Sequence, residues 1–194
     1  LYHVPELVPD DVLAQVGAKA AREAFAHVPV ATLDDLESAD AILFETFSEL
    51  AEALVGLRAA RENTSLPVAV SMMFDSGPDR MSTMMGTSAH QAAEELTRAG
   101  ADIIGCNCGV GPQVMLECIE RIVRVTDRHL AAQPNAGKPR NFEGRNLYLS
   151  SPEYFASYAK RCARAGARVI GGCCGTTPAH IKAVRKALES KGIP

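Results

Sequence analysis

Residues 101–112 read ADIIGCNCGVGP, and this stretch decides the fold class. A short apolar run ends in a glycine-rich turn, and apolar side chains then recur at intervals of three and four residues, at Met115, Cys118, Ile119, Ile122 and Val123. This order predicts a buried strand, a loop and an amphipathic helix. Together they form one βα unit of a parallel sheet.

The same alternation continues on both sides of this stretch. Nearly continuous apolar runs, as expected for strands covered on both faces, occupy residues 41–46, 67–74, 101–108, 129–135 and 168–172. Helix starts are marked by Ser88 with Gln91, and by the Ser-Pro and Thr-Pro pairs at 151–152 and 177–178. The five units average about 31 residues each, the usual size of a βα unit.

The number of units bears on the architecture. A TIM (β/α)8 barrel needs about 250 residues. Residues 1–40 offer one helix starting near Asp10 and a short strand near residues 28–31, which is too little for three more units. We expect either a half-barrel or, preferably, an α/β TIM barrel that is incomplete at the N-terminus. Residues 1–194 would be a single domain, with residues 1–40 matching it poorly.

Composition narrows the class of protein. The 194 residues carry a net charge of −3, with 47% apolar and 22% charged residues, as in ordinary globular proteins. Acidic residues slightly outnumber basic ones, so no basic patch for nucleic acid is expected. No apolar run approaches the roughly 18 residues of a membrane helix. We therefore expect a cytoplasmic protein without nucleic-acid or membrane partners.

The six cysteines do not suggest a disulfide framework. Cys173 and Cys174 are adjacent, Cys106 and Cys108 lie two apart on a strand, and the remaining two fall on apolar helix stripes. A buried cysteine on such a stripe behaves as a small hydrophobic residue. We expect free or metal-bound thiols in a reducing compartment.

Two cysteine segments lie where a strand ends, GCNCGVGP at 105–112 and GGCCGTTPAHI at 171–181. In a βα barrel these strand ends surround the active site. Cys108 with the Cys173–Cys174 pair would offer three sulfurs to Zn²⁺ and leave one coordination position open for a substrate thiol. Simple packing of the cysteines is the alternative, and spacing leaves Cys106 open as a ligand. His180 is expected to be a surface or capping residue.

Glu45 ends the first strand, so its carboxylate would lie at the barrel mouth and suit an ammonium partner. An acid favoured by the dipole of the following helix is the other interpretation.

Both cysteine segments resemble signatures of the zinc-dependent homocysteine S-methyltransferase family. FET at 44–46, QPNAG at 133–137 and YLSSPEY at 148–154 agree with it, and the resemblance covers residues 41 to about 190. It looks closest to bacterial proteins that fuse this barrel to a methylenetetrahydrofolate reductase.

The resemblance implies specific roles. Cys108, Cys173 and Cys174 would be the zinc ligands, and Glu45 would hold the amino group of homocysteine. Asn107 and Asn135 would shape the same cavity, unless they only satisfy local backbone, and Ser71 is a weaker candidate. The implied reaction transfers a methyl group to homocysteine, forming methionine. The donor could be a methylated corrinoid, a folate, betaine or S-methylmethionine, and the implied partner is a reductase or corrinoid domain. Independently of the resemblance, an open five-stranded sheet would expose two edges, which invites pairing with a second copy of the chain.

One departure from the family supports an alternative function. The family's N-terminal glycine-rich segment with an Asp-Gly pair has no counterpart in residues 1–40. The alternative is a truncated or degenerate module that binds zinc or a partner without catalysis. Redox chemistry of Cys173–Cys174 is a weaker idea, because the pair lacks C-x-x-C spacing.

Overall fold

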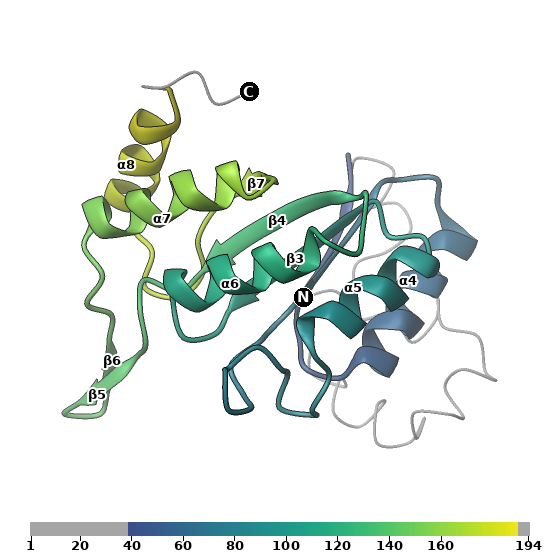
Figure 1. The fold of residues 1–194 in the computed structure, drawn as a ribbon, viewed down its shortest axis with the longest axis horizontal. Coiled ribbons are helices and arrows are strands. Elements are labelled where there is room, and N and C mark those ends of the chain that lie inside the picture. Colours follow the sequence, from purple (N-terminus) through teal and green to yellow (C-terminus); the bar gives the residue numbers. More distant parts are fainter. Residues whose placement is uncertain (1–38, 190–194) are drawn as a thin grey trace.

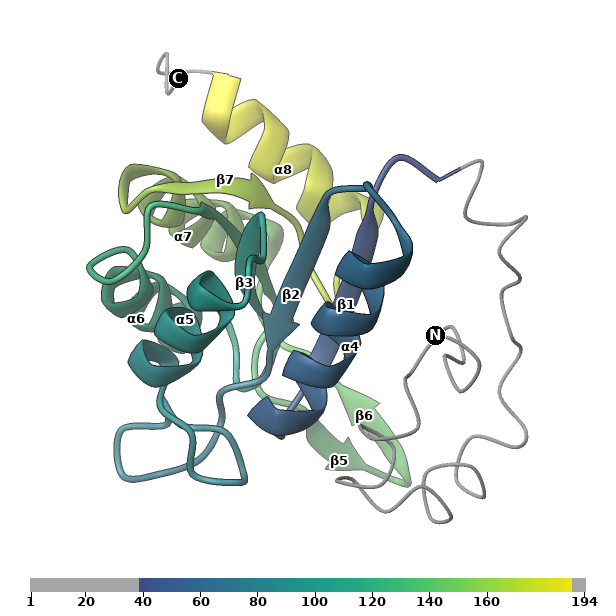
Figure 2. The same ribbon diagram turned by 90° about the vertical axis from the view of Figure 1, so that its right-hand side faces the viewer.

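The computed structural model of the protein describes residues 39–189. Its centre is a sheet of five parallel strands, whose spatial order follows the chain (Figures 1 and 2): β1 (Ile42–Phe47), β2 (Val68–Met72), β3 (Ile103–Cys108), β4 (His129–Pro134) and β7 (Ala167–Ile170). Each of the five expected strands is present; β1 is shifted by one residue, and the other four are somewhat shorter than their apolar runs. The parallel sheet therefore confirms the predicted α/β class.

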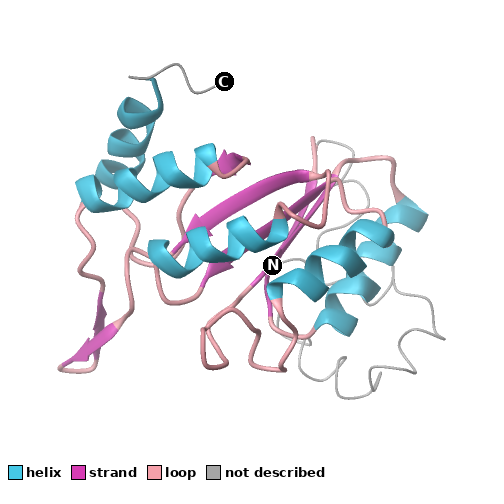
Figure 3. Ribbon diagram, in the orientation of Figure 1, coloured by secondary structure: helices cyan, strands magenta, loops and turns pink. Residues whose placement is uncertain are grey.

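A helix follows each strand of the sheet, as Figure 3 shows: α4 (Leu50–Asn63), α5 (Ala89–Arg98), α6 (Pro112–Ile122), α7 (Pro152–Arg164) and α8 (Pro178–Glu189). The expected start signals operate. The Ser88 hydroxyl accepts a hydrogen bond from Gln91 N at 3.2 Å, and the Ser151 hydroxyl accepts one from Tyr154 N at 3.2 Å. These bonds satisfy backbone donors that a helix leaves free at its first turn.

The main core lies between the sheet and the helices. Alternate strand residues, such as Val70, Ile104 and Leu130, face it and are almost completely buried. Each such side chain contributes about 1.5–3 kcal/mol by leaving water. A smaller separate cluster joins α7 to α8 through Phe155, Ala156, Ala159 and Val184.

The opposite face of the sheet carries smaller residues. A Cβ added at Gly105 would lie 2.8 Å from both the Ser71 hydroxyl and the Ala131 Cβ, so only glycine fits there. Within residues 39–189 the sheet stays open, with β1 and β7 at its edges, and Leu43 and Val169 are 50% and 43% exposed. The five units match part of a barrel. The helix and strand expected within residues 1–40 lie outside the described residues.

A hairpin that the sequence pattern did not predict is inserted between β4 and α7. It consists of β5 (Arg140–Phe142) and β6 (Arg145–Leu147), paired antiparallel. Figures 1 and 2 show it projecting from the side of the sheet where the strands end.

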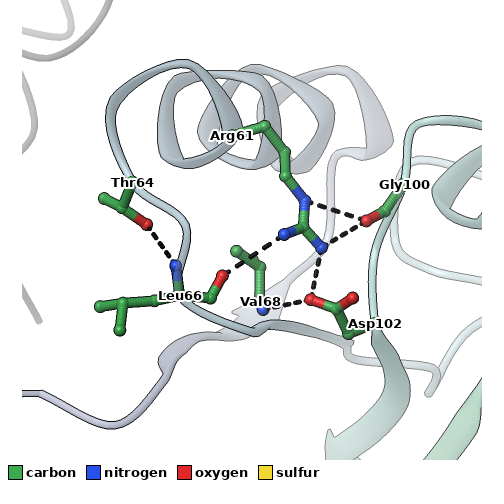
Figure 4. A network of polar contacts seen from close by, with 6 residues as sticks. All are labelled: Arg61, Thr64, Leu66, Val68, Gly100 and Asp102. Carbon is green, nitrogen blue, oxygen red and sulfur yellow. Dashed lines mark hydrogen bonds and ion pairs between the residues drawn. The ribbon is translucent and has the colours of Figure 1, made fainter.

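A polar network ties α4 to the opposite, amino-terminal ends of β2 and β3 (Figure 4). The Arg61 guanidinium donates to Gly100 O at 2.6 and 3.0 Å, to Leu66 O at 3.3 Å, and to the Asp102 carboxylate. Asp102 also accepts from Val68 N at 2.7 Å. In βα barrels, groups at this end serve stability rather than chemistry.

None of the helices in residues 39–189 combines the length and the apolar character needed to cross a lipid bilayer.

Candidate metal centre

Three thiols meet at the carboxyl ends of the strands. The Sγ atoms of Cys108, at the end of β3, and of Cys173 and Cys174, after β7, all lie within 4.8 Å of one another. The Cys173 and Cys174 sulfurs are 3.9 Å apart. Zinc–sulfur bonds of about 2.3 Å in a tetrahedron separate the sulfurs by about 3.8 Å. The donor set and its spacing therefore fit a zinc ion.

The backbone of Cys108 turns its side chain toward this cluster. Its φ is +62°, in the left-handed region, and Gly109 follows with φ +71°. The alternation of a regular strand therefore ends before Cys108. Cys106 instead lies buried in the core, where a hydrogen bond with Cys118 and burial raise the pKa of its thiol well above the usual range. Cys106, which spacing left open as a ligand, is not part of the cluster.

Asn135 joins the two cysteine loops. Its Oδ1 accepts from Cys174 N at 3.0 Å, and its Nδ2 donates to Gly109 O at 2.7 Å. The end of β4 adds two backbone bonds to the same loop, from Cys173 N to Pro134 O and from Ala136 N to Cys174 O. Asn135 is 3% exposed and uses both polar atoms on backbone. This geometry favours the backbone interpretation of Asn135, and substrate contact stays a prediction.

Asn107 stabilises an unusual conformation of Thr46. Asn107 Oδ1 accepts from Thr46 N at 2.8 Å, and its Nδ2 donates to Thr46 Oγ1 at 2.6 Å. Thr46 has φ +66°, which is strained for a β-branched residue. The pairing of β1 with β2 shifts register at this point, between Phe44 and Phe47. The Asn107 Nδ2 also lies 4.0 Å from Cys173 Sγ, so one buried amide contacts both the thiols and the turn beside Glu45.

Glu45 is exposed at the end of β1, as predicted. Its Oε1 accepts a hydrogen bond from Gln133 Nε2 at 2.9 Å. The sequence pattern did not indicate Gln133, which lies in register with Asn107 on the neighbouring strand. Ser71 is completely buried, and its hydroxyl has no hydrogen-bond partner among residues 39–189. Its predicted role toward substrate stays a prediction.

Burial, together with the charges of the neighbouring Cys108 and Cys174, raises the pKa of the Cys173 thiol to about 11. Three thiolates repel one another in a half-buried site, so the anionic form needs a cation. A bound metal ion reverses this balance and favours deprotonated sulfur.

His180 serves structure rather than metal binding. Its Nδ1 accepts from Thr177 N at 3.2 Å, so the neutral ring donates through Nε2 to Ser150 O at 2.9 Å. The expected capping role is confirmed, whereas the expected surface position is wrong, because the residue is 7% exposed. Its ring packs edge-on against Phe155.

The fold and the cluster together define a class: βα-barrel proteins with a cysteine cluster where the strands end. Within that class, the homocysteine S-methyltransferase family model matches residues 8–188, and the chain belongs to this family.

Sequence relatives agree with this assignment. The methionine synthase of Mycobacterium tuberculosis is 32% identical over 175 residues, which cover 87% of this chain and 14% of that protein. The S-methylmethionine–homocysteine S-methyltransferase BHMT2 of Pongo abelii is 31% identical over 170 residues, covering 78% of this chain and 45% of that protein. The chain thus spans less than half the length of either relative.

Among solved structures, the apo form of the homocysteine methyltransferase MmuM from Escherichia coli matches with a TM-score of 0.64 at 23% identity. The match covers 91% of this chain and 57% of that one. The metallated form of MmuM matches with a TM-score of 0.62 at 23% identity, covering 87% of this chain and 49% of that one. These likenesses show a shared fold.

Proposed function

We propose that this chain is the homocysteine-binding part of a zinc-dependent methyltransferase, which transfers a methyl group to the thiol of homocysteine and forms methionine. The observation that supports this most strongly is the meeting of three thiols within 4.8 Å at the strand ends, in a chain of this family. We further propose that residues 1–194 form one barrel-type domain.

Cys108, Cys173 and Cys174 would hold the zinc ion. Sulfur ligands suit Zn²⁺, and three protein ligands leave a fourth position free. When bound, zinc lowers the pKa of a thiol at that position, so that the thiol is available as a thiolate nucleophile at neutral pH. Asn135 fixes the separation of the two cysteine loops through its two backbone contacts.

Glu45 would bind the ammonium group of homocysteine. Gln133 holds Oε1 of this carboxylate, which leaves Oε2 available for a charge-assisted hydrogen bond. The Asn107–Thr46 pair fixes the turn that presents Glu45 and contacts Cys173 on its other side. Asn107 would therefore support both the turn that presents Glu45 to the amino acid and the thiols that hold the metal. Asn107, Asn135 and Ser71 would also shape the cavity that holds the substrate.

The relatives and the family resemblance offer several candidates for the methyl donor. The two relatives are named for methionine synthesis and for S-methylmethionine, and the family resemblance adds folate, corrinoid and betaine. We propose that the donor reaches the thiol cluster from a further domain or partner, such as a corrinoid or reductase domain. Cytoplasmic location, the absence of nucleic-acid and membrane partners, and assembly with a second copy stay predictions from the sequence.

The test combines metal content and methyl transfer. Purified protein should contain one zinc per chain and methylate homocysteine with one of the four donors. Cys173→Ala should lose both, because two sulfurs hold zinc far less tightly. Cys162→Ala is the matched control and should keep its zinc, because Cys162 is buried in the core away from the cluster. Full methyl transfer by metal-free protein would contradict the proposal.

The same preparation distinguishes the non-catalytic alternative. X-ray absorption at the zinc edge should change when homocysteine adds a fourth sulfur. A zinc-loaded protein whose spectrum ignores homocysteine, and which methylates nothing, would support a binding module instead.

A further inference from the structure

Tyr148 approaches the three thiols from a segment to which the proposed function assigns no role. It follows β6 directly, on the chain that returns from the projecting hairpin to α7 (Figure 1). Two hydrogen bonds fix this return at Ser150. Ser150 N donates to Ala136 O at 3.0 Å, and His180 Nε2 donates to Ser150 O at 2.9 Å. The position of Tyr148 is therefore set by both neighbouring loops.

The Tyr148 side chain lies directly on the cysteine loop. Gly175, next to Cys174, has φ +76°, and a Cβ added there would lie 2.2 Å from Tyr148 Cγ and 2.4 Å from Tyr148 Cβ. The ring thus occupies the space that any larger residue at 175 would need. Gly175 serves both the turn and the close approach of this ring.

The phenol end of Tyr148 reaches Cys174, the residue before Gly175. The Tyr148 hydroxyl and the Cys174 thiol form a hydrogen bond. A protonated phenol is a hydrogen-bond donor, and a thiolate is an acceptor.

We propose that Tyr148 is a positioning residue of the metal centre, whose O–H donates to Cys174 Sγ while its ring covers one side of the thiol cluster. This inference rests on the proposed function, because it assumes that the three thiols hold zinc. Outer hydrogen bonds to a metal ligand fix its orientation and adjust its charge, and their loss commonly costs about 10- to 100-fold in metal affinity or activity.

The test is Tyr148→Phe, which removes the hydroxyl and keeps the ring over Gly175. Zinc affinity, measured by competition with a chelating dye, should fall about tenfold. Cobalt should replace zinc in both proteins, and its sulfur-to-metal charge-transfer band should move to longer wavelength in the variant, because Cys174 loses a hydrogen bond and becomes more electron-rich. The melting temperature of the metal-free protein should not change.

Tyr154→Phe is the matched control. Tyr154 lies on α7, where its ring packs at 5.0 Å from that of Tyr158, and the same change there should leave affinity and spectrum unaltered. If the unaltered protein binds zinc and Tyr148→Phe matches it in affinity and cobalt spectrum, the role of Tyr148 is overturned and the proposed function stands. If the unaltered protein takes up no zinc, both fail together.

Discussion

The backbone of Cys108 decides which sulfur atoms can meet. A left-handed conformation costs a residue with a Cβ roughly 1–2 kcal/mol. Neighbouring bonds hold Cys108 in it, since Asn135 N donates to Cys108 O and the Asn135 side chain donates to Gly109 O. Glycine would relax the backbone at this position but would supply no sulfur. Strain of this kind is typical of functional sites.

At the same scale, Glu45 offers a direct test of amino acid binding. Glu45→Gln should raise the KM for homocysteine about tenfold or more, because the ammonium loses an ion pair that carries a charge-assisted hydrogen bond. Zinc content should stay at the wild-type level, since Glu45 is not in the thiol cluster. Steady-state kinetics over a range of homocysteine concentrations measures the change.

Glu49→Gln is a suitable control for that experiment. Glu49 caps α4 by accepting from Ala51 N, a bond that glutamine can also make. A Glu45→Gln protein with unchanged KM would contradict the assigned role.

Sequence predicts single residues well where chemistry and position coincide. Cys108, Cys173, Cys174 and Glu45 could be predicted as candidates because each lies near or just after the end of an apolar strand, and such strand ends share one edge of a parallel sheet. The exclusion of Cys106 could be predicted from the family resemblance but not from spacing, since regular strand alternation places it beside Cys108. Only the positive φ of Cys108 separates them. Gln133 was missed because its significance lies in a contact with Glu45, 88 residues away.

At the scale of elements, the Arg61–Asp102 network makes stability depend on pH. Burial raises the pKa of Asp102, but the hydrogen bond from Val68 N and the Arg61 guanidinium lower it more, so that it falls below the ordinary value of 3.8. A carboxyl with a depressed pKa in the folded state stabilises the fold above the unfolded pKa. This contribution is present above about pH 4 and is lost as the pH falls through the folded pKa.

Asp102→Asn should therefore destabilise the protein by about 1 kcal/mol at pH 7 and by less at pH 3. The figure is small because the Asp102 side chain is 40% exposed. Urea unfolding at both pH values gives the difference in free energy. Asp127→Asn should change little at either pH, because that side chain is 90% exposed. An Asp102→Asn defect that grows as the pH falls would contradict the sign.

The β5–β6 hairpin is an element that the sequence pattern does not predict. Its two central residues, Glu143 and Gly144, both have positive φ (+49° and +77°), as a type I′ turn requires. Asn-Gly or Asp-Gly is the usual sequence sign of this turn, and Glu-Gly is not. Its strands are three residues each and exposed throughout, so they show no apolar alternation. The helices and sheet strands could be predicted because burial imposes a period on them.

At the scale of the whole molecule, the six cysteines divide into two populations. Cys106, Cys118 and Cys162 are buried in the core, whereas Cys108, Cys173 and Cys174 are partly or fully exposed. In metal-free native protein, iodoacetamide should modify these three thiols before the buried ones, with Cys173 the slowest of the three at neutral pH because its raised pKa keeps it protonated. Zinc should protect all three, because coordinated sulfur is less available, and denaturant should release all six for reaction.

Peptide mass spectrometry identifies the modified residues. Rapid modification of Cys106 in native protein would contradict the division, and so would unchanged modification of Cys173 in the presence of zinc.

The short pairing of β7 with β4 couples binding at the three thiols to the stability of β7 and of the helices packed around it. β7 pairs with β4 at only three positions, with an irregularity between Leu130 and Ala131, and the helices before and after it, α7 and α8, share their own small cluster. An ion held by Cys173, Cys174 and Cys108 would therefore also link this region to the middle of the sheet. Because such coupling is reciprocal, a contact that stabilises α8 should raise the affinity of the three thiols for the ion. Fraying of α8 should lower that affinity to the same degree.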